Sequence, residues 1–217
     1  MAVFKIGFLM VAFLLALEQG WKGLGGYGLS IKSAWGYNLM KGLCIGITGF
    51  GFSILCSIAL GYERVIEYPT IQAIIKQLPT LLLMTSIPSI AEDILTRGYL
   101  YGHLGSKMKK EYWILLSAIV FVLNHVWRLN DGAAVLTYLF LLGLLLAYTV
   151  WNTKSLWLAF GIHWGSNLAY ESTNSLFNIE SLVSHKCSTW ILAMIWGVIL
   201  IILLFFSRSI NLKSSVS

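Results

Sequence analysis

The stretch Leu78–Tyr99, LPTLLLMTSIPSIAEDILTRGY, decides how this chain folds. It begins as an apolar run of the kind that crosses a membrane and then places Glu92, Asp93 and Arg97 within two helical turns. A charged group at bilayer depth costs roughly 2.5 to 3.5 kcal/mol on insertion scales. A chain therefore keeps several such groups only where they meet partners or perform chemistry.

The composition excludes an ordinary water-soluble protein. Of the 217 residues, 58% are hydrophobic and only 11% are charged, and the mean hydropathy is +0.78. Apolar stretches follow one another with no long polar segment between them. We therefore expect a single integral membrane domain over residues 1–217.

Apolar runs that could cross a membrane recur along the whole chain. Lys5 interrupts the start of the first run and no small-residue cleavage site follows it, which favours an uncleaved helix over a signal peptide. Four glycines between residues 23 and 28 leave room for an eighth, amphipathic segment ending at Tyr37. The sequence predicts an all-α, polytopic transmembrane bundle of seven or eight helices with an intramembrane polar cavity. The seven candidate spans cover residues 2–17, 42–61, 77–102, 112–127, 133–151, 155–170 and 189–206.

The formal net charge of +6 is distributed over short connections rather than gathered in one basic block. This pattern is typical of membrane orientation and of contact with membrane lipids, and it argues against nucleic-acid binding. The positive-inside rule predicts a multi-pass protein of the cell membrane with a cytoplasmic C-terminus. With seven spans, the cytoplasmic side would carry Lys22, Lys32, Lys41, Lys107, Lys109, Lys110, Lys154, Arg208 and Lys213.

The two carboxylates of the acidic motif point in different directions. Asp93 and Arg97 are one turn apart on the same helical face, whereas Glu92 points about 100° away from Asp93. We therefore expect Asp93 to pair with Arg97 and Glu92 to remain available. A free carboxyl in an apolar bundle is a plausible general base.

Two further motifs place imidazoles at four-residue spacing. Phe121 stands one turn before His125, so the ring could limit the water around that imidazole. His163 and Asn167 share one face of the sixth run. Both side chains can donate hydrogen bonds to one point, as stabilisation of an oxyanion requires.

These three stretches resemble the three motifs of the CAAX protease and bacteriocin-processing family of membrane endopeptidases, also called CPBP or Abi. The matching patterns are E-D-x-x-x-R-G from Glu92, F-x-x-x-H from Phe121 and H-x-x-x-N from His163, in the same order. The family usually has a second glutamate where this chain has Asp93, so the shorter arm could change the contact with Arg97.

The resemblance covers residues 80–170, which would form the motif-bearing catalytic core, and it implies peptide-bond hydrolysis inside the membrane. It assigns water activation to Glu92 and His125 and stabilisation of the oxyanion to His163 and Asn167. Asp93 and Arg97 would hold the site together, and Phe121 would support it by packing. The implied substrate is a membrane-bound or membrane-proximal peptide: a lipidated CAAX tail in eukaryotic relatives, or a peptide of bacteriocin processing or self-immunity in bacterial ones.

Three alternatives stay open at the level of sequence. The chain lacks the H-E-x-x-H run of many zinc proteases, yet Glu92, His125 and His163 could together ligate zinc. We favour catalysis without a cofactor and keep the zinc enzyme as an alternative. A non-catalytic bacteriocin-immunity or scaffold protein could keep the same polar residues for folding. A proton-coupled transporter could use them as a relay, although no internal repeat is visible.

Overall fold

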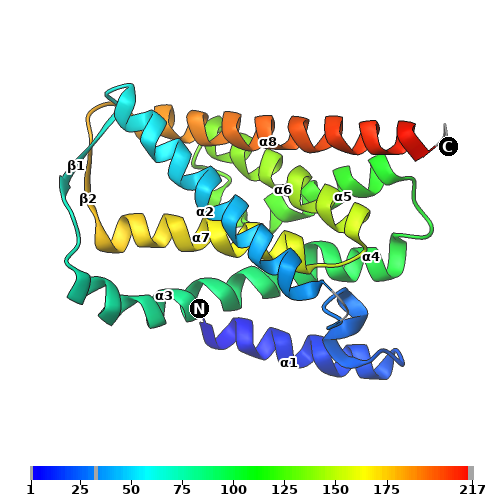
Figure 1. Cartoon of the computed structure of the whole chain (residues 1–217). Helices are drawn as coiled ribbons and strands as arrows, with labels where there is room; N and C mark the ends of the chain where they lie inside the picture. Colours follow the sequence, from blue (N-terminus) through cyan, green and yellow to red (C-terminus); the bar gives the residue numbers. More distant parts are fainter. Residues whose placement is uncertain (1, 32–33, 215–217) are drawn as a thin grey trace.

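The computed structural model describes residues 2–31 and 34–214, and it confirms the predicted all-α class (Figure 1). Its helices are α1 (Ala2–Glu18), α2 (Trp35–Ala59), α3 (Ile71–Asp93), α4 (Tyr99–Leu104), α5 (Lys110–Asn124), α6 (Ala133–Thr153), α7 (Trp157–Leu176) and α8 (His185–Ser214). Three short turns, η1 (Gly23–Tyr27), η2 (Ile94–Gly98) and η3 (Val126–Arg128), and two strands, β1 (Glu63–Glu67) and β2 (Asn178–Ser181), complete the described elements.

The helix containing the acidic motif is longer than its predicted span. α3, η2 and α4 form one continuous helical segment, Ile71–Leu104, of 34 residues. Its start is fixed by Thr70, whose side chain accepts a hydrogen bond of 3.2 Å from the backbone N–H of Ala73. With α3, η2 and α4 counted as one, the described helices form seven helical segments. The glycine-rich connection contains the short turn η1 rather than a further long helix.

Four helical segments are long and apolar enough to cross a membrane, namely Trp35–Ala59, Ile71–Leu104, Ala133–Thr153 and Lys186–Phe205. Large apolar side chains such as Phe52, Leu83 and Phe205 are 59%, 59% and 66% exposed on them. Exposed apolar surface of this extent is typical of helices that face lipid. The chain is a membrane protein.

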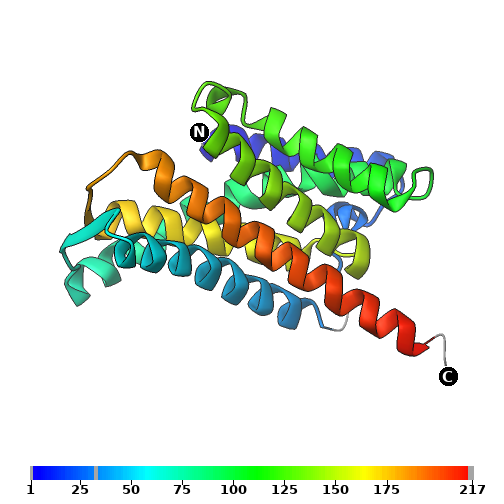
Figure 2. The same ribbon diagram turned by 90° about the horizontal axis from the view of Figure 1, so that it is seen from above.

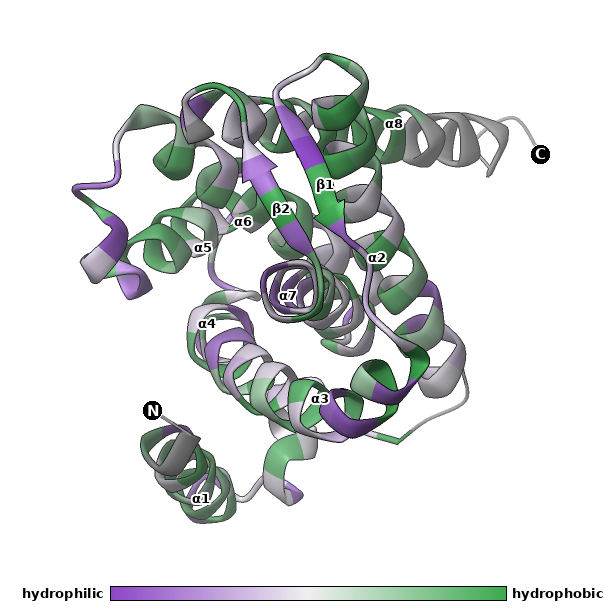
Figure 3. Cartoon of the chain, turned by 90° about the vertical axis from the view of Figure 1, so that its left-hand side faces the viewer, coloured by the Kyte–Doolittle hydropathy of each residue, from purple (hydrophilic) through white to green (hydrophobic). Residues whose placement is uncertain are grey.

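Helix α7 is the centre of the bundle. In the view along the bundle it is surrounded by α2, α3, α4, α5 and α6, whereas α1 stands apart beside α3 (Figure 3). Because α7 carries His163 and Asn167, its central position buries His163 and half-buries Asn167.

Glycines bring α7 and α2 into backbone contact. A Cβ built on Gly42 would lie 2.8 Å from the Cα of Gly161, and one on Gly46 would lie 2.3 Å from a backbone oxygen of α7. In the other direction, a Cβ on Gly165 would lie 2.6 Å from the carbonyl oxygen of Leu43. Glycines four residues apart on both helices thus form a small-residue interface of the kind that drives helix association in membranes.

A small sheet closes one end of the bundle, where β1 follows α2 and β2 follows α7 (Figure 1). The strands are antiparallel, with Arg64 opposite Glu180 and an irregularity between Val65 and Glu67. The exposed pair Arg64–Glu180 bridges them at 2.6 Å. From above, α8 crosses the molecule over α2 and α7 (Figure 2).

Candidate active site

The two carboxylates lie where α3 changes its helical pitch. α3 ends at Asp93 and continues as the wider π-turn η2, a feature that recurs at functional sites in helices. The hydroxyl of Thr96 donates to the carbonyl of Glu92 at 2.7 Å, and Ser117 of α5 donates to the carbonyl of Thr96 at 2.8 Å. Side-chain hydroxyls therefore hold the backbone of the acidic motif in place.

The predicted pair between Asp93 and Arg97 is confirmed. Both side chains are fully buried, and the guanidinium also donates to the hydroxyl of Thr96 at 2.8 Å. The guanidinium carbon lies 4.5 Å from the centre of the Phe121 ring, so a cation–π contact adds to the pair. The aspartate arm thus reaches Arg97 despite being shorter than the glutamate usual in the family pattern.

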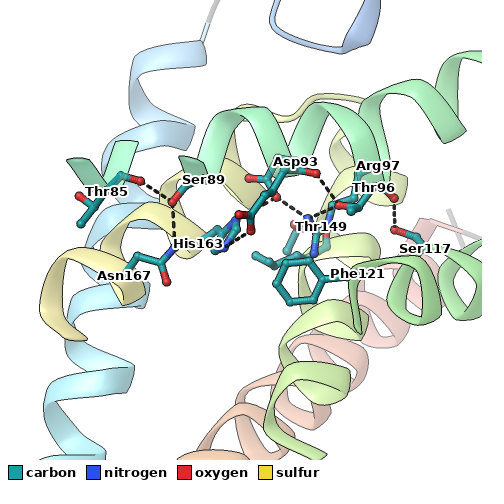
Figure 4. Close-up of polar contacts among 12 residues, drawn as sticks. Thr85, Ser89, Asp93, Thr96, Arg97, Ser117, Phe121, Thr149, His163 and Asn167 are labelled. Atoms are coloured by element: carbon teal, nitrogen blue, oxygen red, sulfur yellow. Dashed lines mark hydrogen bonds and ion pairs between the residues drawn. The ribbon is translucent and has the colours of Figure 1, made fainter. Parts of the chain in front are cut away.

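Asp93 also joins α3 to the central helix. Nδ1 of His163 lies 3.2 Å from Oδ1 of Asp93, and the imidazole is 2% exposed. A carboxylate can only accept, so Nδ1 of His163 carries the proton and Nε2 faces the interior of the site. Figure 4 shows this imidazole between Asp93 and Phe121.

His125 is oriented in the same way from another helix. α5 ends at Asn124, and the tighter turn η3 follows, with His125 between them. Nδ1 of His125 lies 2.8 Å from the carbonyl oxygen of Phe121, so Nδ1 is again the protonated nitrogen. The predicted contact with the Phe121 ring is confirmed, with centroids 4.7 Å apart, and the same ring lies 5.3 Å from that of His163.

Both imidazoles turn Nε2 toward one oxygen of Glu92. Oε2 of Glu92 is 3.6 Å from Nε2 of His125 and 3.8 Å from Nε2 of His163. These separations exceed a direct hydrogen bond, and they suit a water molecule that bridges the groups. Three polar atoms, from α3, from α7 and from the residue after α5, therefore face the place where a nucleophilic water could be held.

The expectation that Glu92 remains free is wrong. Its other oxygen, Oε1, accepts a hydrogen bond of 3.0 Å from Nζ of Lys5 on α1. The 100° separation from Asp93 does keep Glu92 out of the pair with Arg97, but it also points the carboxylate toward α1. Sequence analysis missed this partner, although a lysine inside an apolar run was a visible signal of a buried pairing.

Asn167 reaches the site through a residue that the sequence motifs did not include. Its Nδ2 donates to the hydroxyl of Ser89 at 2.9 Å, and Ser89 donates to the carbonyl of Thr85 at 2.7 Å. The carboxamide keeps a second N–H for another acceptor. Thr85, Ser89 and Asp93 follow one another at four-residue spacing and form a polar stripe on α3 (Figure 4). This spacing could have revealed the face from the sequence. The indole N–H of Trp164 also donates to the hydroxyl of Thr85, at 3.0 Å.

The site is nearly closed, and its exposure increases toward α1. The side chain of Asp93 is 0% exposed, that of Glu92 9%, that of His125 14% and that of Lys5 22%. A separate polar pocket of about 640 Å³ lies at one end of the bundle and is lined by η1, α4 and the α6–α7 connection, including Trp21, Ser106 and Lys154. None of these motif residues lines that pocket.

The zinc alternative depends on Glu92, His125 and His163 as ligands. Nδ1–H bonded to a carboxylate or a carbonyl, with Nε2 left free, is the arrangement common in metal-binding histidines. Over residues 2–31 and 34–214, however, no group of three His, Cys, Asp or Glu side chains is arranged to hold a metal ion. The donor chemistry fits zinc, and the arrangement of the described side chains does not.

Comparison with known families now identifies this core. Residues 74–169 match the family model described as type II CAAX prenyl endopeptidase Rce1-like. This segment is Rce1-like. It contains all three motifs, so the resemblance seen in the sequence is confirmed, and the matched family is one of membrane proteases. No curated protein and no solved structure matches the chain.

Proposed function

We propose that this Rce1-like chain is an intramembrane endopeptidase that hydrolyses a peptide bond in a membrane-bound or membrane-proximal peptide. The observation that carries the proposal is the approach of His125 and His163 to Oε2 of Glu92, at 3.6 and 3.8 Å. A water held there would lose its proton to Glu92 or His125 as it attacks the scissile carbonyl.

The oxyanion of the tetrahedral intermediate would be stabilised from α7. Asn167 has one N–H bonded to Ser89, which orients the carboxamide and leaves the second N–H for the oxyanion. Nε2 of His163 donates to the oxyanion only when both ring nitrogens carry protons, so in this role His163 enters the step as an imidazolium. The proton that Glu92 or His125 takes from the water passes to the leaving amine as the C–N bond breaks. Asp93, held by Arg97, fixes the ring orientation through Nδ1.

The test is a comparison of membrane peptides from cells that produce the wild-type protein or Glu92→Gln. New peptide termini should appear with the wild type and be lost with Glu92→Gln, because a carboxamide cannot accept the proton. The control is Glu111→Gln, which removes an exposed carboxylate at the start of α5. Unchanged cleavage in Glu92→Gln at equal abundance would favour a non-catalytic immunity or scaffold protein. Proton flux into liposomes without cleavage would favour a transporter.

Catalysis without a metal is part of the proposal and has its own measurement. Elemental analysis of the active purified protein should find no stoichiometric zinc, and chelation should leave the rate unchanged. Zinc at one equivalent, lost together with activity on chelation, would establish the zinc enzyme with Glu92, His125 and His163 as its protein ligands.

We further propose a multi-pass topology with a cytoplasmic C-terminus and contact with anionic lipids. Lys154 lies in one pocket with Trp21 and Ser106, the chain neighbours of Lys22 and Lys107, so these predicted cytoplasmic positions gather at one end of the bundle. Lys32 and residues 215–217 lie outside the described residues. Reporter fusions after residue 217 that are active only outside the cytoplasm would contradict this orientation.

A further inference from the structure

Lys5 is a cation in a helix whose other residues are apolar up to Leu17. α1 has exposed apolar side chains on its outer face, among them Phe4, Met10 and Leu14 at 84%, 65% and 63% exposure. An ammonium in such a helix is costly in a membrane unless it meets a partner. The partner is Oε1 of Glu92, 3.0 Å away and 87 residues distant in the sequence.

The two oxygens of Glu92 have different neighbours. Oε1 is bound by Lys5, whereas Oε2 faces the imidazoles of His125 and His163. Lys5 therefore leaves the reactive side of the carboxylate open while it limits rotation of the group.

The nearby guanidinium is not available for the same task. Arg97 is bound to Asp93 and Thr96, and in residues 2–31 and 34–214 no lysine or arginine apart from Lys5 forms an ion pair with Glu92. Within these residues, Lys5 is therefore the cation that holds the Glu92 carboxylate in place.

We propose that Lys5 is a positioning residue of the active site, supplied by α1 to hold the Glu92 carboxylate with Oε2 turned toward the two imidazoles. This inference rests on the proposed proteolytic function. It extends the site beyond residues 74–169, because α1 lies outside the segment that matches the family model. It also gives α1, which packs on α3 at the edge of the bundle, a defined task in catalysis (Figure 3).

The contact itself is tested without any substrate. Full-length protein in lipid vesicles is treated with a carbodiimide, which joins a carboxylate and an amine only when they touch. Mass spectrometry should find an amide between Lys5 and Glu92, absent from Lys5→Met and from Glu92→Gln. Activation of Glu92 that ends in capture by an added amine, with no link to Lys5, would overturn the proposal.

The positioning role is tested by infrared spectroscopy and kinetics on Lys5→Met, Lys5→Arg and the control Lys22→Met, an exposed loop lysine. Lys5→Met should show a new carboxyl band, displaced in frequency because the contact with the ammonium is lost, and assigned to Glu92 by its loss in Lys5→Met/Glu92→Gln. With the peptide found in the cellular comparison, its kcat should fall about 10- to 100-fold with little change in KM. Lys5→Arg should return the infrared band and kcat toward their wild-type values. Lys22→Met should match the wild-type protein in both measurements.

The outcomes separate the two proposals. Cleavage that survives Glu92→Gln contradicts the protease, whatever Lys5 does. Cleavage that is lost in Glu92→Gln but kept in Lys5→Met, with no new carboxyl band, contradicts the positioning role alone. If Lys5→Met does not fold, the crosslink in the wild-type protein and the rate of Lys5→Arg still decide.

Discussion

Two ion pairs start from neighbouring residues of α3 and differ in almost every respect. Asp93 pairs with Arg97 one turn away, and both side chains are fully buried. Glu92 pairs with Lys5 on a separate helix, and the two side chains are 9% and 22% exposed. A closed pair made within one helix serves structure, whereas an open pair made between helices leaves one carboxylate oxygen for chemistry. In the proposed mechanism, support and catalysis are thus assigned to two neighbouring residues.

The largest effect is expected when the closed pair is broken. Arg97→Met should lower the free energy of unfolding by about 3 to 5 kcal/mol, because Asp93 is left as an uncompensated buried charge. Denaturant unfolding in detergent micelles measures this loss. The double variant Asp93→Leu/Arg97→Met should regain much of the stability while remaining inactive. Equal stability of Arg97→Met and the wild type would remove the structural role assigned to the closed pair.

A smaller effect is expected at the Phe121 ring, which contacts Arg97 of the closed pair and the two imidazoles. Phe121→Leu keeps an apolar side chain but removes the aromatic face over Arg97 and the edges against His125 and His163. Loss of the cation–π contact should cost about 0.5 to 2 kcal/mol in unfolding experiments. The rate should fall as well, since the ring also borders both imidazoles. A rate equal to the wild type would limit Phe121 to packing.

Ser89 tests whether support and catalysis are also separate one turn below Asp93. Ser89→Ala removes the acceptor of Asn167 Nδ2. A hydrogen bond of this kind contributes about 0.5 to 1.5 kcal/mol, so kcat should fall by up to roughly tenfold with only a small change in stability. Steady-state kinetics and thermal unfolding of the same preparation give both numbers. A large loss of stability with an unchanged rate would instead make this contact structural.

The smallest loss of stability is expected for the exposed ion pair between Arg64 and Glu180. Its side chains are 62% and 49% exposed, so Arg64→Ala should cost between about 0 and 1 kcal/mol and should weaken further in high salt. Thermal unfolding at two salt concentrations measures it. A cost as large as that of Arg97→Met would show that the small sheet between β1 and β2 contributes more to the fold than its exposure suggests.

What could be predicted from the sequence depended on short-range geometry. The apolar runs gave the helical class, and four-residue spacing gave the contacts of Asp93 with Arg97 and of Phe121 with His125. These relations are fixed by the pitch of one helix and need no knowledge of packing. The π-turn η2 did not disturb them, because Arg97 still reaches Asp93.

Only the tertiary structure decided which helices meet. The close approach of α2 and α7 through Gly46 and Gly165, the bond from Asn167 to Ser89 and the pairing of Lys5 with Glu92 all join distant segments. Such contacts depend on how whole helices pack, and a periodic apolar pattern is compatible with many packings. The sequence by itself therefore determined the membrane-helical class and the residues that could carry the chemistry. Packing determined their partners, because the direction of a side chain between helices is set by its neighbours.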